Sequence, residues 1–535
     1  MLTRSLAVAV TLLSAVFAQA TPTFDFTADH TTISTGTGAA VFVDKTSGEL
    51  AQDVVVRLEW SEGLDLYDGI HSTTLDGGNE WQCATSPAQR AANCSVDEFG
   101  ADDFAGIFFS FVATDTAGGH RSATATLSAR DLGIVKTIVF DVISGHSWSV
   151  TSSSDFGEGS LRAAIEEVNA NPLCGTDVPC SISIGGQSHF SPPITIAPAT
   201  PLPPIRKCNL SIAGFDDLEF PLAVKRVTIS GENASYGNGL EVRASCAAGI
   251  SGVSISSMAV HSWPWNGIHF ASPEPWGGTY AHSVARVYVG TDATGLEARP
   301  NLSRGINVDS PYDRVSVFSS IVSANGRSGI AFWQGTRANV TLSKLGLGRD
   351  GRPLGNGAGG FFSQGVPFQL ASNVIAYNRF SGVAITPGTA DALVTHNAIY
   401  ANANLPIDWG IDDRTLPDDE TDGILNAPRL LDAFYNDGAL TTTFRGVVRL
   451  RAGAFGGRPF AIILYLASSE RGDVIGQVSI PPQGVTAPQE GTADVPFEIT
   501  IAGVPRGTLI AAQTLAGSVG SGGVTSEISE AVRVR

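Results

Sequence analysis

The chain contains three stretches with different patterns of apolar and polar residues. From Thr21 to about Val142, short runs that alternate apolar and polar residues are separated by turns rich in Gly, Asp and Ser. Strands at this spacing, without helical stretches, predict a β-sandwich of immunoglobulin-like size. From about Asn426 a second set of alternating strands runs to the end of the chain and predicts another β-sandwich.

The middle stretch repeats itself. Each repeat has a short apolar strand, a polar turn that usually contains Asn, and a second apolar strand, and some repeats carry a Gly-rich insertion. A Gly precedes the second strand of successive repeats at intervals of 23 to 38 residues, at positions 239, 267, 305, 329, 359 and 382. A period near 20–30 residues with insertions confined to turns is typical of a parallel β-helix.

Glycine and asparagine in these repeats have a structural interpretation. We expect each repeated Gly to lie at a corner of the coil with a positive φ angle. Asn325, Asn378 and Asn402 occupy equivalent turns, and we interpret them as a ladder of hydrogen bonds that runs up the solenoid.

One amphipathic helix is predicted just before the repeats, over 160–171. Ser160 is a suitable N-cap, and an apolar stripe recurs at Leu161, Ala164, Ile165 and Val168 before Asn171-Pro172 ends the helix. The first coil of a β-solenoid exposes an apolar end and free strand edges. We therefore expect this helix to cover the start of the solenoid.

Several segments resemble bacterial secreted proteins named for a Cys-Ser-Leu-Arg-Glu-Ala (CSLREA) motif. The similar segments are SVTSSSDFGEGSLRAAIEEVNA (149–170), GTDATG (290–295), the run 404–428 and TSEISEAV (525–532). In this chain the motif reads Gly-Ser-Leu-Arg-Ala-Ala, so its Cys and its Glu are missing. The resemblance implies a right-handed parallel β-helix of the pectin-lyase-like type and an exported protein, without implying a reaction. The first stretch, with Trp81-Gln82-Cys83, is similar to sandwich modules of bacterial surface proteins.

These observations together predict an all-β protein with four parts. Residues 1–20 have a positive start, an apolar core and Ala18-Gln19-Ala20, as in a secretory signal peptide that is too short to span a membrane. An immunoglobulin-like sandwich is expected over 21–145, the helix-capped β-helix over 146–425, and the second sandwich over 426–535. We expect the protein to be exported by a bacterium and to be secreted or held at the cell surface.

The six cysteines fit an oxidising destination. Cys83 and Cys94 lie in one turn-rich segment, and Cys174 and Cys180 bracket a short turn, so each pair is a local disulfide, which leaves Cys208 with Cys246. A net charge of −18 argues against nucleic acids or anionic membranes as partners, because both bind basic patches.

An acidic run near the end of the repeats is a candidate metal site. Its carboxylates include Asp408, Asp412, Asp413, Asp418 and Asp422. Clustered carboxylates in a loop suit Ca²⁺, which takes six to eight oxygen ligands. A solvated acidic linker is the alternative interpretation.

A tryptophan-rich segment, 261–280, is the candidate ligand-binding site. Trp263, Trp265, Trp276 and Tyr280 lie among prolines and glycines, which places them on strands or on a loop of the solenoid. Their flat rings could stack on sugar rings. The alternative is that the rings cover a coil or pack against the first sandwich.

No catalytic set can be identified in the sequence. Asp309 with Asp313 and Arg314, and Asp350 with its neighbouring arginines, are more typical of surface ion pairs than of an acid–base pair. We therefore expect a non-catalytic surface or matrix protein that recognises glycans through the β-helix. A polysaccharide lyase or glycoside hydrolase is the alternative, and it depends on fold-level analogy alone.

Overall fold

The computed structural model describes the strands, the helix and most of their connections. The described residues are 22–29, 31–34, 38–47, 50–74, 81–99, 104–113, 120–130, 132–143, 146–172, 174–176, 178–185, 193–216, 224–246, 249–273, 280–411, 427–451, 460–469, 472–477, 483–485, 491–517 and 523–535. The proposed signal peptide, 1–20, lies outside them. No helix among the described residues is long and apolar enough to cross a membrane.

The N-terminal unit consists of two sheets that enclose one hydrophobic core. One sheet has the order β1 (Thr23–Ala28), β3 (Gly38–Ser47), β8 (Phe104–Ala113), β5 (Leu64–Thr74). The other has the order β2 (Thr32–Ser34), β10 (Gly133–Ile143), β9 (His120–Ala129), β4 (Ala51–Trp60), β7 (Ala91–Phe99), β6 (Gln82–Ser86), with the short 3-10 helix η1 (Pro87–Gln89) before β7. The pairing is antiparallel except between β2 and β10.

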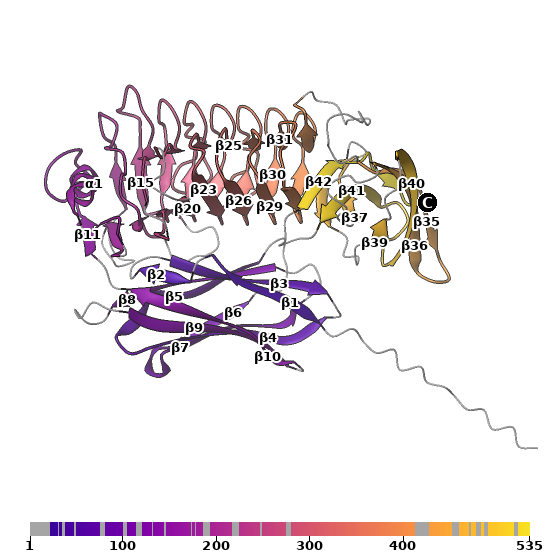
Figure 1. Cartoon of the computed structure of the whole chain (residues 1–535), viewed down its shortest axis with the longest axis horizontal. Helices are drawn as coiled ribbons and strands as arrows, with labels where there is room; N and C mark the ends of the chain where they lie inside the picture. Colours follow the sequence, from indigo (N-terminus) through magenta and orange to yellow (C-terminus); the bar gives the residue numbers. More distant parts are fainter. Residues whose placement is uncertain are drawn as a thin grey trace, which may run out of the picture.

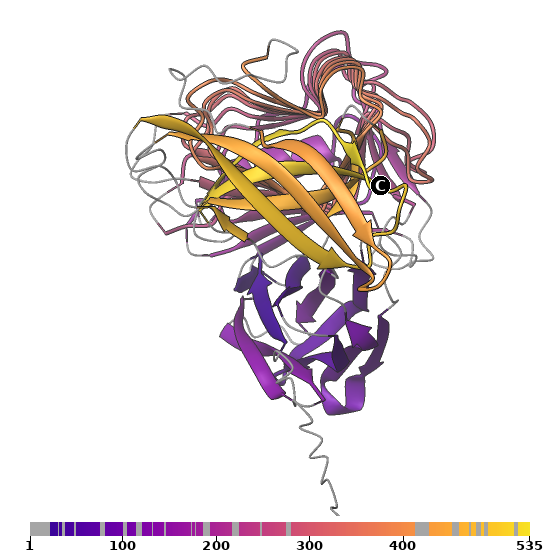
Figure 2. The same cartoon turned by 90° about the vertical axis from the view of Figure 1, so that its right-hand side faces the viewer.

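The middle of the chain is a parallel β-helix, so the predicted fold class is confirmed (Figures 1 and 2). From residue 210 onward, each coil contributes one strand to each of three parallel sheets, here named sheets 1, 2 and 3. Sheet 1 contains β11 (His146–Val150), β12 (Cys180–Ile184), β14 (Leu210–Ala213), β17 (Val253–Ser256), β20 (Tyr280–Ala285), β23 (Asp313–Phe318), β26 (Arg337–Thr341), β29 (Phe368–Ala371) and β32 (Ala392–Thr395). Sheet 2 contains β13 (Ile194–Ile196), β15 (Val227–Ser230), β18 (Ala259–His261), β21 (Tyr288–Val289), β24 (Ile321–Val322), β27 (Lys344–Leu345), β30 (Val374–Ala376) and β33 (Ala398–Tyr400). Sheet 3 contains β16 (Leu240–Val242), β19 (Ile268–Phe270), β22 (Ile306–Val308), β25 (Ile330–Phe332), β28 (Phe361–Ser363), β31 (Val383–Ile385) and β34 (Ile407–Trp409).

The asparagine ladder predicted from the repeats is present at the corner between sheets 2 and 3. The side-chain amide Nδ2 of each buried Asn donates to Oδ1 of the next, at 2.9 to 3.0 Å, in the order Asn301, Asn325, Asn356, Asn378 and Asn402. A shorter ladder at the corner between sheets 1 and 2 links Asn373 to Asn397. Each ladder satisfies buried amides and fixes the register between coils.

The repeated glycines have a different role from the one expected. None of the six anchors has a positive φ angle, so the predicted left-handed corner is wrong. A Cβ atom at Gly239, Gly267 or Gly305 would instead lie 2.5 to 2.9 Å from the carbonyl oxygen of the equivalent residue in the next coil. The anchors are glycine because successive coils approach too closely for any side chain.

Helix α1 (Leu161–Ala170) covers the first coil, as the sequence predicts (Figure 1). Oγ of Ser160 accepts the N-cap hydrogen bond from the backbone N–H of Ala163, and Leu161, Ile165 and Val168 are buried. Arg162, the arginine of the divergent motif, pairs with Asp155 at 2.6 Å. The helix is thereby attached to the chain that precedes it.

The last coil is covered by the C-terminal strands. β42 (Gly523–Ile528) lies beside β32 and β34, where the backbone N–H of Trp409 donates to Oε1 of Glu527 at 2.9 Å and that of Val394 to Oγ1 of Thr525 at 3.0 Å. Hydrogen bonds that a further coil would supply are thus made by the TSEISEAV segment.

The C-terminal strands divide between two sheets. β38 (Val474–Gln477) pairs with β33, so sheet 2 continues through β37 (Phe460–Ala467), β39 (Gln483–Val485), β41 (Leu509–Gly517), β42 and β43 (Val532–Arg533). β35 (Arg429–Asn436), β36 (Thr441–Arg451) and β40 (Thr492–Ala502) form a separate antiparallel sheet. One hydrophobic core runs from the solenoid into these strands. The domain boundaries at 145 and 425 stay predictions.

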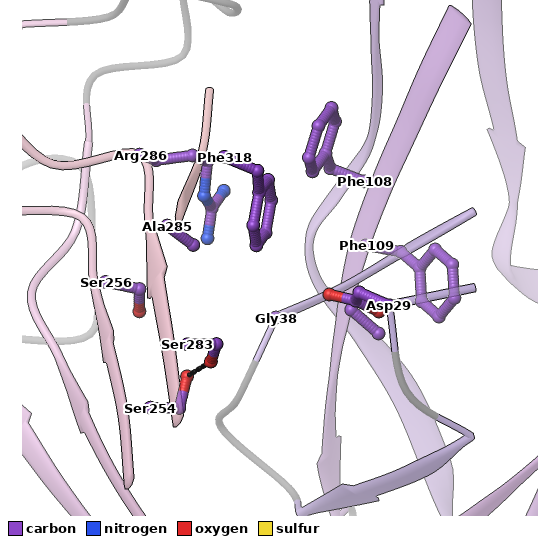
Figure 3. A pocket seen from close by; sticks show the side chains of 11 residues that line it. Asp29, Gly38, Phe108, Phe109, Ser254, Ser256, Ser283, Ala285, Arg286 and Phe318 are labelled. Carbon is purple, nitrogen blue, oxygen red and sulfur yellow. Dashed lines mark hydrogen bonds between the residues drawn. The ribbon is translucent and has the colours of Figure 1, made fainter. Parts of the chain in front are cut away.

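The N-terminal unit covers the outer face of sheet 1. The rings of Phe108 and Phe318 stack there with centroids 5.5 Å apart, beside Phe42 and Ala285. The side chain of Arg286 points toward Gly38 at the edge of this contact, above the hydrogen-bonded pair Ser283 and Ser254 (Figure 3).

Sheet 2 is covered by its own insertion. Ala293, in the GTDATG segment, packs on the ring of Tyr288, and Nζ of Lys225 lies 4.5 Å from the centre of that ring and pairs with Asp216. Sheet 3 lies on the side of the solenoid opposite to the N-terminal unit (Figure 1).

The structure contains the three disulfides expected from the cysteine spacing. They join Cys83 to Cys94, Cys174 to Cys180 and Cys208 to Cys246. The last two lie within the first coils, close to the helix-covered end.

Removing the apolar contact of α1 should destabilise the protein. Leu161→Ala should lower the free energy of unfolding by about 2–5 kcal/mol, because the buried side chain leaves a cavity over the first coil. Glu166→Ala on the exposed side of the same helix should change it by less than about 0.5 kcal/mol. Equilibrium denaturation measured for both variants checks this, and equal stability of the two would contradict the covering role of α1.

Candidate functional site

The outer face of sheet 3 carries a polar cluster over its first coils. Strands β16, β19 and β22 pair in register, so Glu241, His269 and Asn307 stand in one row about 4.8 Å apart. Farther along the sheet the same row continues with Ala331, Phe362, Ala384 and Asp408. Charge and hydrogen-bonding capacity are therefore concentrated at one end of this face.

A continuous network joins two carboxylates through His269. Nδ2 of Asn238 donates to Oε2 of Glu241 and to Nδ1 of His269, both at 3.2 Å. Nε2 of His269 lies 2.9 Å from Oδ2 of Asp309. Glu241 also pairs with Arg243, which follows on the same strand.

The orientation of the Asn238 amide fixes the tautomer of His269. Oδ1 of Asn238 accepts from both the backbone N–H and the side-chain amide of Asn266, at 3.1 and 3.0 Å, so Nδ2 must face the imidazole. Nδ1 of His269 is then an acceptor, and Nε2–H donates to Asp309. Both ring nitrogens are occupied within the protein.

Aromatic and guanidinium groups continue the cluster on the next coils. The guanidinium of Arg304 lies 4.7 Å from the ring centre of Trp333, and the ring of Trp333 lies 4.7 Å from that of Phe362. Asn307 is buried beside them, with Nδ2 bonded to Asp309 at 2.7 Å and Oδ1 without a hydrogen-bond partner. The exposed carboxylate of Asp309 suits hydrogen-bond donors from a ligand, whereas Oδ1 of Asn307 is buried.

The electrostatics of the cluster keep Asp309 ionised. The hydrogen bond from His269 is the largest cause that holds the pKa of Asp309 below its usual range. Partial burial is the largest cause that lowers the pKa of Arg304, and the charge of nearby Arg327 adds to it. A lowered pKa keeps the Asp309 carboxyl ionised as a hydrogen-bond acceptor.

Two of the four aromatic residues that the sequence predicts to bind a ligand are buried in the structure. Trp263 is fully buried inside the coil, where its Nε1 donates to the carbonyl of Ile229, and Tyr280 is 1% exposed. Neither ring presents a face to a ligand, so the prediction is wrong for both. Trp265 is 52% exposed and lies 6.4 Å from the ring of Tyr236, and Trp276 lies outside the described residues.

Of the five carboxylates predicted to bind calcium, the structure describes one, Asp408. Asp408 lies on β34 and is buried, and its Oδ2 accepts a hydrogen bond from Oγ of Ser381 at 2.7 Å. Asp412, Asp413, Asp418 and Asp422 lie outside the described residues. Within the described residues no group of three potential metal ligands is found, and calcium binding stays a prediction.

The acid–base candidates from the repeats are separated by the fold. Asp313 is completely buried and bonds to His282 at 3.3 Å, away from Asp309 on the outer face. Asp350 forms an exposed ion pair with Arg352 at 3.1 Å. Asp350 forms the surface ion pair that the sequence favoured, whereas Asp313 is buried and hydrogen-bonded to His282, so the surface interpretation is wrong for Asp313.

Sequence reasoning missed Glu241, His269 and Asn238. A signal for them exists, because the residue two positions after Gly239, Gly267 and Gly305 lies in this row of sheet 3. Aligning the chain on Gly239, Gly267 and Gly305 would have placed Glu241, His269 and Asn307 in one row.

No protein-family model matches the chain, and no curated protein matches it either. Among solved structures, the chain is similar to a family 28 exopolygalacturonase of Yersinia enterocolitica, with 9% identity, 72% of this chain and 76% of that chain covered, and a TM-score of 0.31. It is also similar to the A-module of the mannuronan C-5 epimerase AlgE4 of Azotobacter vinelandii, with 11% identity, 49% and 92% covered, and a TM-score of 0.23. A third similar structure is the collagen-binding domain of a Staphylococcus aureus adhesin, with 6% identity, 22% of this chain and 96% of that chain covered, and a TM-score of 0.18. At these scores the similarity carries no argument about function, and the strand pairing itself establishes the β-helix.

Removing the imidazole should raise the pKa of Asp309. His269→Ala deletes the hydrogen bond that contributes most to the lowered value, so the carboxyl should titrate closer to an ordinary aspartate. Because the wild-type pKa is lowered, Asp309 stabilises the fold above the ordinary carboxyl pKa, and this contribution is lost as the pH falls through the lowered value. Carboxyl titration by NMR with labelled aspartate measures the shift, and an unchanged Asp309 would contradict the network.

Proposed function

We propose that this protein acts outside the cytoplasm as a glycan-binding protein, with a polysaccharide lying along sheet 3. The observation that carries the proposal is the hydrogen-bonded cluster of Asn238, Glu241, His269 and Asp309 on the outer face of that sheet. Carboxylates and amides of this kind bind sugar hydroxyl groups, and the rigid backbone of the solenoid holds them in a fixed row.

Exposed aromatic rings beside the cluster support the proposal. Trp265 and Tyr236 lie at the corner between sheets 2 and 3, where the backbone N–H of Trp265 donates to the carbonyl of Gly237 in the preceding coil. An exposed indole on a fixed turn offers a flat apolar face with little loss of side-chain freedom on binding.

The chemistry of the cluster favours binding over catalysis. Both ring nitrogens of His269 are hydrogen-bonded within the protein, and the lowered pKa of Asp309 keeps this carboxyl ionised near neutral pH. Glu241 is paired with Arg243. These groups suit the recognition of a ligand that leaves unchanged.

An exported location is part of the proposal. Three disulfides favour an oxidising compartment, and the signal-peptide pattern of residues 1–20 agrees with it. Membership of the CSLREA-type proteins is proposed from the helix segment and from TSEISEAV, whose Thr525 and Glu527 bond to the last coil.

Two substitutions on sheet 3 should weaken glycan binding without unfolding the protein. Asp309→Asn removes a charge while keeping an acceptor for His269, and Trp265→Ala removes the exposed indole. Each should raise the Kd for a retained polysaccharide about tenfold or more, as measured on a glycan array and by calorimetry.

Asp350→Asn, which breaks an exposed ion pair elsewhere, is the matched control and should leave the Kd unchanged. The same incubations are analysed for new reducing or unsaturated sugar ends. Release of such ends by the wild type would contradict a binding role and favour a lyase or hydrolase, and an unchanged Kd in both variants would remove sheet 3 as the site.

A further inference from the structure

A lysine and an aspartate lie buried together at the corner between sheets 1 and 2. Lys225 and Asp216 are partners in an isolated antiparallel bridge, and Nζ of Lys225 lies 3.1 Å from Oδ1 of Asp216. Their side chains are 1% and 8% exposed. Among the described residues, neither carboxylate oxygen of Asp216 has a hydrogen-bond partner, so the contact is close without the alignment of a hydrogen bond.

The surroundings of the lysine exclude water from its amine. Nζ of Lys225 lies 4.5 Å from the ring centre of Tyr288, a buried residue of β21, two coils farther along sheet 2. The backbone N–H of Lys225 donates to the carbonyl of Ala293, in the insertion that packs on the same ring, at 2.8 Å. The amine is therefore fixed against an aromatic ring beside the carboxylate.

Burial disfavours two full charges at this place. An ammonium and a carboxylate taken out of water are stabilised only where hydrogen bonds satisfy them, and the carboxylate of Asp216 lacks such bonds. Burial is also the largest cause that lowers the pKa of Lys225, and the charge of Asp216 does not outweigh it. A proton moved from Nζ to the carboxylate leaves a neutral amine, which is a nucleophile, beside a carboxylic acid.

We propose that Lys225 and Asp216 form an intramolecular amide bond in the folded protein. The lone pair of Nζ attacks Cγ of Asp216 and forms a C–N bond. One C–O bond of the carboxyl breaks, and its oxygen leaves as water with a proton from Nζ. Nothing is oxidised or reduced, and the fold supplies the proximity that the reaction needs.

The amide bond strengthens one of the first coils of the solenoid. It joins the chain that leaves β14 of sheet 1 to the chain that enters β15 of sheet 2. The disulfide between Cys208 and Cys246 already links two points of the same coil. This inference is independent of the proposed function, because the pair lies away from sheet 3.

An exposed pair of the same two residue types is a matched internal control. In the N-terminal unit, Nζ of Lys136 donates to Oδ1 of Asp25, also at 3.1 Å, but the two side chains are 42% and 54% exposed. Water solvates both ions there, so the amine keeps its proton and no amide bond is expected. The equal distances make burial and alignment the differences between the two pairs.

Peptide mapping of the full-length protein tests the bond. Glu219 lies between Asp216 and Lys225 in the sequence, so a protease that cleaves after glutamate separates the two residues. After reduction of the disulfides and digestion, the two wild-type peptides should stay joined, with a combined mass lower by one water molecule. Lys225→Arg should give two separate peptides, because it keeps the charge and removes the amine. The peptides of Lys136 and Asp25 should also be separate.

Separate Asp216 and Lys225 peptides from the folded wild type would overturn the proposal and leave an ordinary buried ion pair. Joined peptides from wild-type protein that was kept unfolded in denaturant, or an equally joined control pair, would also contradict it, since the fold would then not be the cause. The decisive digest uses the wild type, so the result holds even if Lys225→Arg fails to fold.

Discussion

The hydrogen bonds between stacked asparagine amides are the constraint on which the rest of the solenoid depends. Each buried amide between Asn301 and Asn402 bonds to its equivalent in the next coil. A shift of one residue in any coil would leave buried donors unsatisfied, at a cost of about 1–3 kcal/mol for each group. The ladder therefore fixes the register from the coil of Asn301 onward. In the earlier coils, hydrogen bonds from Asn266 to Oδ1 of Asn238 and from the backbone N–H of Arg304 to Oδ1 of Asn266 link the turns that precede Glu241, His269 and Asn307, and these three residues stand in one row.

Other surfaces of the solenoid are covered in part by the rest of the chain. Helix α1 covers the first coil and β42 the last, so the apolar ends and free strand edges lie against protein. The N-terminal unit packs on sheet 1 through Phe108, and the GTDATG insertion packs on sheet 2 through Ala293. Sheet 3 lies on the side of the solenoid opposite to the N-terminal unit and carries the polar cluster (Figure 1).

The fold was predictable because it depends on local and periodic features. The spacing of the glycines indicated the coils, and the stripe from Leu161 to Val168 indicated the covering helix. The site was less predictable, because the network of Asn238, His269 and Asp309 joins residues of three coils that are 31 and 40 positions apart in the chain. Tryptophan content was misleading, since Trp263 and Trp265 are two residues apart, yet one is buried in the core and the other is exposed.

The most direct test of binding along sheet 3 is hydrogen exchange of the whole protein with and without oligosaccharides of a polymer that the protein retains on a glycan array. Backbone amides in the turns at 236–238, 264–266, 302–304 and 326–328 should exchange more slowly when the oligosaccharide is present, whereas the N-terminal unit should be unaffected. Protection confined to the N-terminal unit or to the C-terminal strands would contradict a binding site on sheet 3.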